Sequence, residues 1–336
     1  MLLFGLSLNR TICFYGPSLV VFDEFFARQD NGIKALYSKA KENKLKLPVG
    51  MTERMQSEFK KLIMSSTNSD NDLTRALACG LKSDLLIVKN YDKELLEMLD
   101  IVDYTIMNFD AISSKESELT CYRKLAYVSD ILFRNTPLNL IDGEHSYEAT
   151  KVARNINMKA VDDDDDEKKD LIGRKIDLII KGSGLEMCSS EWKKTITTAS
   201  IIEQQRIKNI RTNSAMLHKL YKLIDHDDLF LLGMDWVGFV GLMFSTSQIC
   251  DVHCVHIVSE LVFPKTMNVL KIFEKTLNLL YIFKHHNLNL LEMAIPAIER
   301  QEVEAQFQLI SSSKESSLMR RAPVTFFTPK KRDKRN

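Results

Sequence analysis

Residues 173–194 constrain the fold of this chain more than any other segment. Positions 174–180 are rich in β-branched and apolar residues, Lys-Gly-Ser-Gly follows at 181–184, and positions 185–193 can return beside the first run. Two such runs around a glycine-containing turn are typical of a β-hairpin. Because a sheet must bury at least one face against other elements, the neighbouring segments decide the fold class.

Helical patterns flank this hairpin on both sides. Apolar residues recur at three- and four-residue spacing in 53–64, 71–88, 93–107, 117–133, 197–224 and 266–286. Two apolar runs, 234–247 and 249–263, predict strands around a Ser-Thr-Ser-Gln turn, and a further strand is expected between 138 and 159. The order of helix, hairpin, helix, two strands and helix predicts an α/β (α+β) fold, with a central mixed sheet flanked by helices.

The chain divides into three parts. A length of 336 residues corresponds to about two domains at roughly 150 residues each. We expect a mostly helical N-terminal region over 1–112, an α/β core over 113–289, and a polar tail with a basic C-terminus over 290–336. Consecutive acids within 161–170 repel one another, so they predict an exposed loop inside the core rather than a metal site.

Composition excludes several classes of protein. The net charge of +1 indicates no partner, and six cysteines spread over the chain fit a reducing intracellular compartment better than a disulfide framework. No apolar run reaches the ~20 residues that span a bilayer, so no membrane partner is expected. The Cys- and His-rich run at 250–256 would divide its ligands between the two faces of a strand, which disfavours a zinc site.

The hairpin carries the residues best suited to chemistry. Glu191 and Lys193 are two apart in the second strand and share one face, whereas Trp192 points the opposite way into packing. If the turn is centred near Gly184, Asp177 lies directly opposite Glu191, at the ~5 Å spacing of cross-strand neighbours. Two such carboxylates can hold Mg²⁺, and the nearby lysine can orient a water or neutralise a phosphate. A shifted register would separate the acids.

These residues resemble the PD-(D/E)xK nuclease superfamily, which has a restriction-endonuclease-like fold. The matching positions are Ile176-Asp177 and, after a glycine turn, Glu191-Trp192-Lys193; isoleucine stands where the superfamily's name has proline. A group of fungal proteins with a GRKID…ExK hairpin and a downstream Asp-Trp-x-Gly strand is also similar. The resemblance covers about 113–285. It implies that Asp177, Glu191 and the Trp192 backbone carbonyl bind Mg²⁺, and that Lys193 assists the attacking water.

Further site residues follow from the same resemblance. Many members carry a glutamate on the first core helix, for which Glu118 is the candidate; its alternative role is a helix-start charge favoured by the dipole. Gln204 or Gln205 would match the glutamine often found on the helix after the hairpin. On that helix Gln204, Lys208 and Arg211 share a face that could contact phosphates of a nucleic acid, although such a charged face is also compatible with simple solvation.

The tail predicts a location. Lys330, Lys331, Arg332, Lys334 and Arg335 resemble a short basic nuclear-import signal, or form a nonspecific basic tail. The resulting hypothesis is an intracellular, nuclear, Mg²⁺-dependent nuclease acting on nucleic acid. Its alternatives are a catalytically inactive nuclease-like module that binds nucleic acid, and a scaffold that binds a protein partner through the N-terminal helices.

Overall fold

A seven-stranded mixed sheet forms the centre of the molecule. The computed structural model describes residues 11–42, 45–65, 71–109, 116–142, 149–152, 176–224, 226, 228–250 and 252–310. The strands are β1 (Thr11–Cys13), β2 (Leu138–Asp142), β3 (Leu178–Gly182), β4 (Leu185–Lys193), β5 (Phe230–Val237), β6 (Val240–Ile249) and β7 (Val252–Val262). Their order across the sheet is β1-β7-β6-β5-β4-β3-β2. The β1–β7 and β4–β5 pairs are parallel, and the other pairs are antiparallel.

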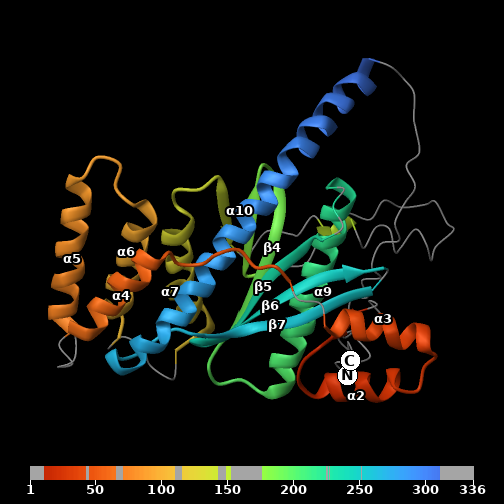
Figure 1. The fold of residues 1–336 in the computed structure, drawn as a ribbon, viewed down its shortest axis with the longest axis horizontal. Helices are drawn as coiled ribbons and strands as arrows, with labels where there is room; N and C mark the ends of the chain where they lie inside the picture. The colour runs from red at the N-terminus through yellow and green to blue at the C-terminus, as the bar shows by residue number, and fades with distance from the viewer. Residues whose placement is uncertain are drawn as a thin grey trace, which may run out of the picture.

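Helices cover both faces of this sheet. They are α2 (Gly16–Phe26), α3 (Asn31–Lys41), α4 (Glu53–Ser65), α5 (Asn71–Ile87), α6 (Lys93–Met107), α7 (Glu118–Phe133), α9 (Ala199–Leu223) and α10 (Met267–Ile310). Figure 1 shows α4, α5 and α6 grouped at one end of the molecule and α2 with α3 at the other, while α10 runs across it. Among the described residues, no helix is long and apolar enough to cross a membrane.

Strand β4 is the most buried strand of the sheet. Eight of its nine residues are buried, because α9 packs on one face while α7 and α10 pack on the other. Ser189 faces α9, where its Oγ donates to Asn209 Oδ1 at 2.8 Å. Trp192 faces α7 and makes an edge-on contact with Tyr122, with ring centroids 5.1 Å apart. Ser189 and Trp192 therefore lie on opposite faces of β4, and Trp192 is packed in the interior as expected.

Most of the elements expected from the sequence are present. The mixed α/β architecture is confirmed, as are the hairpin, the strand after residue 138, and the helices before and after them. The N-terminal region additionally supplies strand β1, which pairs with β7. The side chains of α4, α5 and α6 share one hydrophobic core with the sheet and α10.

Three expectations about the C-terminal half were wrong in detail. The expected Ser-Thr-Ser-Gln turn lies inside strand β6. The run 234–247 is not one strand, because β5 ends at Val237 and β6 begins at Val240. The break at Gly238 is hidden in an apolar run because the buried strands on each side are themselves nearly continuous in apolar residues. The helix expected over 266–286 continues to Ile310, so it crosses the expected boundary at 290.

Candidate active site at the end of strand β4

The β3–β4 hairpin has the register that brings the two acids together. Leu178 pairs with Ser190 at the end of the ladder, and Asp177, the residue before Leu178, is a charged neighbour of Glu191. Ser183 and Gly184 occupy the turn with φ of 48° and 75°, as in the type I′ turns that match strand twist. Asp177 Oδ2 also accepts the Trp192 backbone N–H at 2.7 Å, which fixes this carboxylate against the return strand.

Glu191 is a carboxylate buried beside other charges. Its side chain is 1% exposed, and Lys208 Nζ of α9 lies 2.7 Å from its Oε1. Burial raises the pKa of Glu191 to about 8; Lys208 opposes this shift, whereas the neighbouring Asp177 and Asp235 add to it. A buried acid with two acidic neighbours favours a bound cation or proton at this position.

Lys193 reaches round the end of β4 to α7. Its Nζ donates to Glu118 Oε1 at 2.9 Å and to the Trp192 carbonyl at 2.7 Å. Glu118 is the first residue of α7, after the N-cap Ser117, whose side chain accepts from Thr120 N. The structure therefore places Glu118 at the candidate site, where it contacts the lysine rather than facing solvent alone.

The turn between β5 and β6 holds Lys193 from the other side. The Gly238 N–H donates to the Lys193 carbonyl at 2.6 Å. Gly238 has a φ of +60°, and a Cβ at this position would lie 2.1 Å from Thr195 Oγ1. Glycine is therefore required both by the backbone conformation and by the close approach of the two chain segments.

Asp235 is a buried acid that the sequence reasoning did not place in the site. It is the parallel register partner of Glu191 and is 5% exposed. Asn209 Nδ2 donates to Asp235 Oδ1 at 2.7 Å, and Arg206 Nε lies 3.8 Å from Oδ2. Burial raises its pKa to about 6, while Asn209 and Arg206 act in the opposite direction. The signal was an aspartate inside a strand that is otherwise apolar.

The three residues proposed to contact nucleic acid do not form one exposed face. Gln204 is exposed, Lys208 is paired with Glu191, and the Arg211 side chain is 9% exposed. The reason is that α9 is buried around most of its circumference from Asn209 to Tyr221. The acidic run at 161–170 and the basic tail at 330–335 lie outside the described residues.

The donor set at Asp177 and Glu191 fits Mg²⁺ only with water as the main ligand. Carboxylate and carbonyl oxygens are the ligands that Mg²⁺ prefers, and the repulsion between these two acids would be relieved by a cation. Within the described ranges, however, no group of three or more His, Cys, Asp or Glu side chains is placed to hold a metal ion. The Trp192 carbonyl, the third expected ligand, accepts a bond from Lys193.

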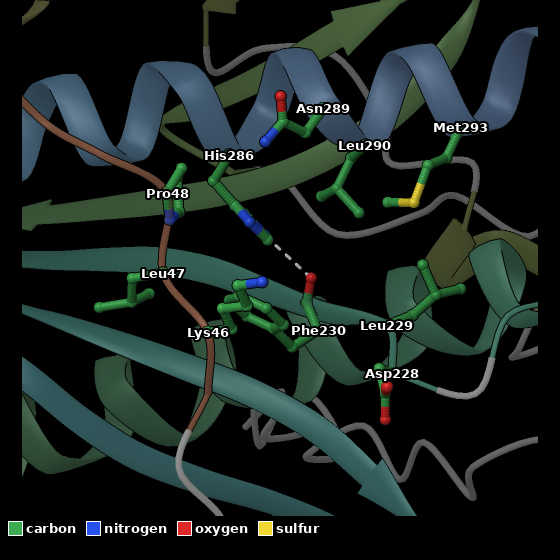
Figure 2. A pocket seen from close by; sticks show the side chains of 10 residues that line it. All are labelled: Lys46, Leu47, Pro48, Asp228, Leu229, Phe230, His286, Asn289, Leu290 and Met293. Carbon is green, nitrogen blue, oxygen red and sulfur yellow. Dashed lines mark hydrogen bonds between the residues drawn. The ribbon is translucent and has the colours of Figure 1, made fainter.

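A separate cavity of about 290 Å³ lies between α10, the start of β5 and the segment 46–48. Figure 2 shows the imidazole of His286 pointing toward Phe230, whose carbonyl accepts a bond from His286 Nε2 at 3.0 Å. Burial lowers the pKa of His286 to about 4, so the ring is neutral near pH 7. The walls of this cavity include Leu47, Leu229 and Met293, and none of the acids of the hairpin site lines it.

Comparison with known proteins gave no family assignment: no family model, no curated protein and no solved structure matches this chain. The geometry at the end of β4 is therefore the basis for a functional proposal.

Proposed function

We propose that this protein is a Mg²⁺-dependent phosphodiesterase that acts on nucleic acid. The observation that carries the proposal is that Asp177 accepts the Trp192 N–H beside Glu191 at the end of β4, while Lys193 donates to the Trp192 carbonyl and to Glu118. Metal-assisted hydrolysis of a phosphodiester needs acids that can bind the metal ion together and a nearby cationic group. The two carboxylates and the lysine are groups of these kinds.

The order of elements supports a restriction-endonuclease-like core. Helix α7, the β3–β4 hairpin, helix α9 and the strands β5 and β6 occur in the order that the PD-(D/E)xK resemblance implies, with strand β2 in addition between α7 and β3. Strand β5 lies beside β4 in parallel and β3 lies on its other side, so β4 is an inner strand, and Asp177, Glu191 and Lys193 lie near its C-terminal end. This arrangement is the reason for preferring a nuclease over other metal-dependent hydrolases.

Each residue has a separate role in the proposed reaction. Asp177 and Glu191 would hold Mg²⁺, which supplies activation of the attacking water and charge neutralisation at the phosphate. Lys193 would orient that water or stabilise the negative charge that develops on the phosphate oxygens. Glu118 would act as a positioning residue, because its bond to Nζ fixes where the ammonium group of Lys193 lies.

One experiment tests the proposal directly. Purified protein is incubated with single- and double-stranded DNA and RNA in Mg²⁺ or in EDTA. We expect cleavage in Mg²⁺ only, and its loss in Asp177→Asn and Glu191→Gln. Glu292→Gln, on the exposed face of α10, is the control and should cut normally. Undiminished cleavage by both site variants would rule out this site.

A specific observation favours a second candidate, a nuclease-like module that binds nucleic acid or a protein without cutting. Lys208 already neutralises Glu191 at 2.7 Å, and Lys193 is already paired with Glu118. Such pairs can stabilise acids in the absence of any metal. Binding of nucleic acid with no cleavage in Mg²⁺, Mn²⁺ or EDTA would support this candidate over the enzyme.

A further inference from the structure

A lysine side chain lies where a cation would bind to Glu191. Lys208 Nζ is 2.7 Å from Glu191 Oε1, and the side chain of this acid is 1% exposed. Asp177 and Asp235 add negative charge around the same carboxylate. A buried acid of this kind is stable as an anion only when a cation compensates its charge. In the metal-free protein, the ammonium group of Lys208 supplies that compensation.

The contact between Lys208 and Glu191 has the distance of a hydrogen bond but not its angles. Within the described part of the chain, Glu191 Oε1 is one of the buried side-chain atoms that accept no hydrogen bond. A buried ion pair is favourable only when its geometry is good and the remaining bonding positions are filled. Lys208 therefore compensates the charge of Glu191 but leaves Oε1 without a directed bond, which coordination to a metal ion would supply.

Of the two partners, only the lysine can leave. The side chain of Lys208 is 36% exposed, and an ammonium group on a flexible four-carbon stem is strongly hydrated in water. Glu191 belongs to β4, an inner strand of the sheet, and cannot follow. Mg²⁺ keeps several waters when it binds a carboxylate, so the hydrated metal would need the space beside Oε1 that Nζ fills. Two cations on one buried carboxylate also repel each other.

We propose that Lys208 is a resident counter-ion that Mg²⁺ displaces. Without metal, its ammonium group neutralises Glu191; when Mg²⁺ binds to Asp177 and Glu191, the lysine turns into solvent beside the site. The inference rests on the proposed function in one respect, since it takes the metal site from there. It goes further by making metal binding an exchange of one cation for another. The charge of the buried acids is then compensated in both states, and Mg²⁺ binding exposes a lysine that the metal-free protein holds at Glu191.

The reactivity of the Lys208 amine measures this exchange without any substrate. The full chain is treated briefly with acetic anhydride over a range of Mg²⁺ concentrations, and the acetylation of each lysine is quantified by mass spectrometry. Lys208 should be acetylated several-fold faster in saturating Mg²⁺ than in EDTA. The internal control is Lys82, which is paired with Asp100 and Asp103 and should react at the same rate in both. An unchanged rate at Lys208 would overturn the inference.

Two variants locate the effect. Glu191→Gln removes the charge that holds the ammonium group, so Lys208 should react quickly even in EDTA, and Mg²⁺ should change its rate no further. Asp177→Asn weakens the metal site but changes neither member of the pair, so Lys208 should react slowly both in EDTA and in Mg²⁺. A slow reaction of Lys208 in Glu191→Gln would contradict the assignment. The Mg²⁺ titration of the wild type gives the answer even if a variant does not fold.

The failure of this inference and the failure of the proposed function are distinguishable. Faster acetylation of Lys208 in Mg²⁺, together with no cleavage of any nucleic acid, would support the exchange of cations and reject the nuclease. Mg²⁺-dependent cleavage with an unchanged rate of acetylation at Lys208 would support the nuclease and reject the exchange.

Discussion

Lys208 Nζ lies 2.7 Å from Glu191 Oε1, so the most buried acid of the candidate site is paired with a cation from helix α9. The side chain of Lys208 is 36% exposed, whereas that of Glu191 is 1% exposed. The lysine can therefore move into solvent when a ligand takes its place, but the glutamate cannot. This asymmetry makes Glu191 the residue whose charge should most affect both stability and metal binding.

Glu191→Gln should flatten the dependence of stability on pH. Burial raises the pKa of Glu191 in the folded state to about 8, from 4.5. Between pH 4.5 and pH 8, the Glu191 side chain therefore keeps its proton in the folded chain and has lost it in the unfolded chain. The stability that this proton provides is fully present below pH 4.5 and is lost as pH rises through 8. The variant should therefore gain stability relative to the wild type at pH 9, as measured by urea unfolding from pH 5 to 9.

The control for that series is Glu118→Gln, because Glu118 is 42% exposed in its pair with Lys193. Its unfolding free energy should run nearly parallel to that of the wild type over the same pH range. If the unfolding free energy of Glu191→Gln also changes with pH in parallel with that of the wild type, the prediction that the pKa of Glu191 is raised is wrong.

Mg²⁺ should stabilise the folded protein at pH 8. A ligand that binds only the folded state raises the unfolding free energy by about 2.7 kcal/mol at one hundred times its dissociation constant. We expect a rise in Tm with Mg²⁺ concentration for the wild type, and little or no rise for Asp177→Asn or Glu191→Gln. Differential scanning calorimetry measures this. An equal rise in all three proteins would place the Mg²⁺ elsewhere.

Lys193→Met should remove most of any cleavage activity. A positioned group that takes part in proton transfer contributes typically 10²- to 10⁴-fold in rate, and we expect a loss of that size in kcat. The neighbouring Lys194 is exposed, so Lys194→Met tests for the loss of a positive charge at the same end of β4 and should keep nearly full activity. Similar losses of activity in both variants would mean that any positive charge at this end of β4 matters, and not Lys193 in particular.

Glu118→Gln should lower kcat less than Lys193→Met, because an amide oxygen can still accept from Nζ. The pH profile of kcat distinguishes a positioning role from a structural one: it should shift in Glu118→Gln, while the Tm stays near that of the wild type. A lower Tm with an unchanged profile would assign Glu118 a structural role only.

His286→Gln should reduce the loss of stability in acid. Burial lowers the pKa of His286 to about 4 from 6.5, so between these values the unfolded chain binds a proton that the folded chain does not. Stability is therefore lost as pH falls from 6.5 through 4. Urea unfolding at pH 7 and pH 4.5 should show a smaller difference for the variant than for the wild type. His226→Gln, at an exposed histidine, should behave as the wild type does.

Gly238→Ala should destabilise the fold and disturb Lys193. The position has a φ of +60°, and the added Cβ would meet Thr195 Oγ1 at 2.1 Å, so we expect a loss of about 1–3 kcal/mol in unfolding free energy. Gly80→Ala is the control, since nothing lies within 4 Å of a Cβ there and alanine is favoured over glycine in a helix by about 1 kcal/mol. The two substitutions should change stability in opposite directions.

Local pattern was enough to predict the hairpin, whose ladder pairs Leu178 with Ser190 one residue before Asp177. The β-branched run, the turn residues and the two-residue period act over a few positions, so they can be read from the chain directly. The approach of Glu118 to Lys193 joins residues 75 apart in sequence, and the resemblance, rather than any pattern, suggested it.

Asp235 and the burial of Arg211 could not be predicted in this way. Both depend on how α9 lies across the sheet, which brings Asn209 onto Asp235 and buries the surface on which Arg211 lies. The spacing of charged residues on a helix indicates which of them share a face, but not how much of the helix its neighbours cover. Strand β1 was missed because three residues, Thr11–Cys13, are too short to show a period.

The parallel pairing of β4 with β5 has a consequence for how the site is assembled during folding. Parallel neighbours need a long crossover, here α9 and the residues around it, so Glu191 and Asp235 become adjacent only after that crossover has docked. A polypeptide that ends before β5 would contain Asp177, Glu191 and Lys193, yet it would lack Asp235 and the strand that flanks β4 on that side. The buried setting of Glu191 is thereby a property of the complete sheet and not of the hairpin alone.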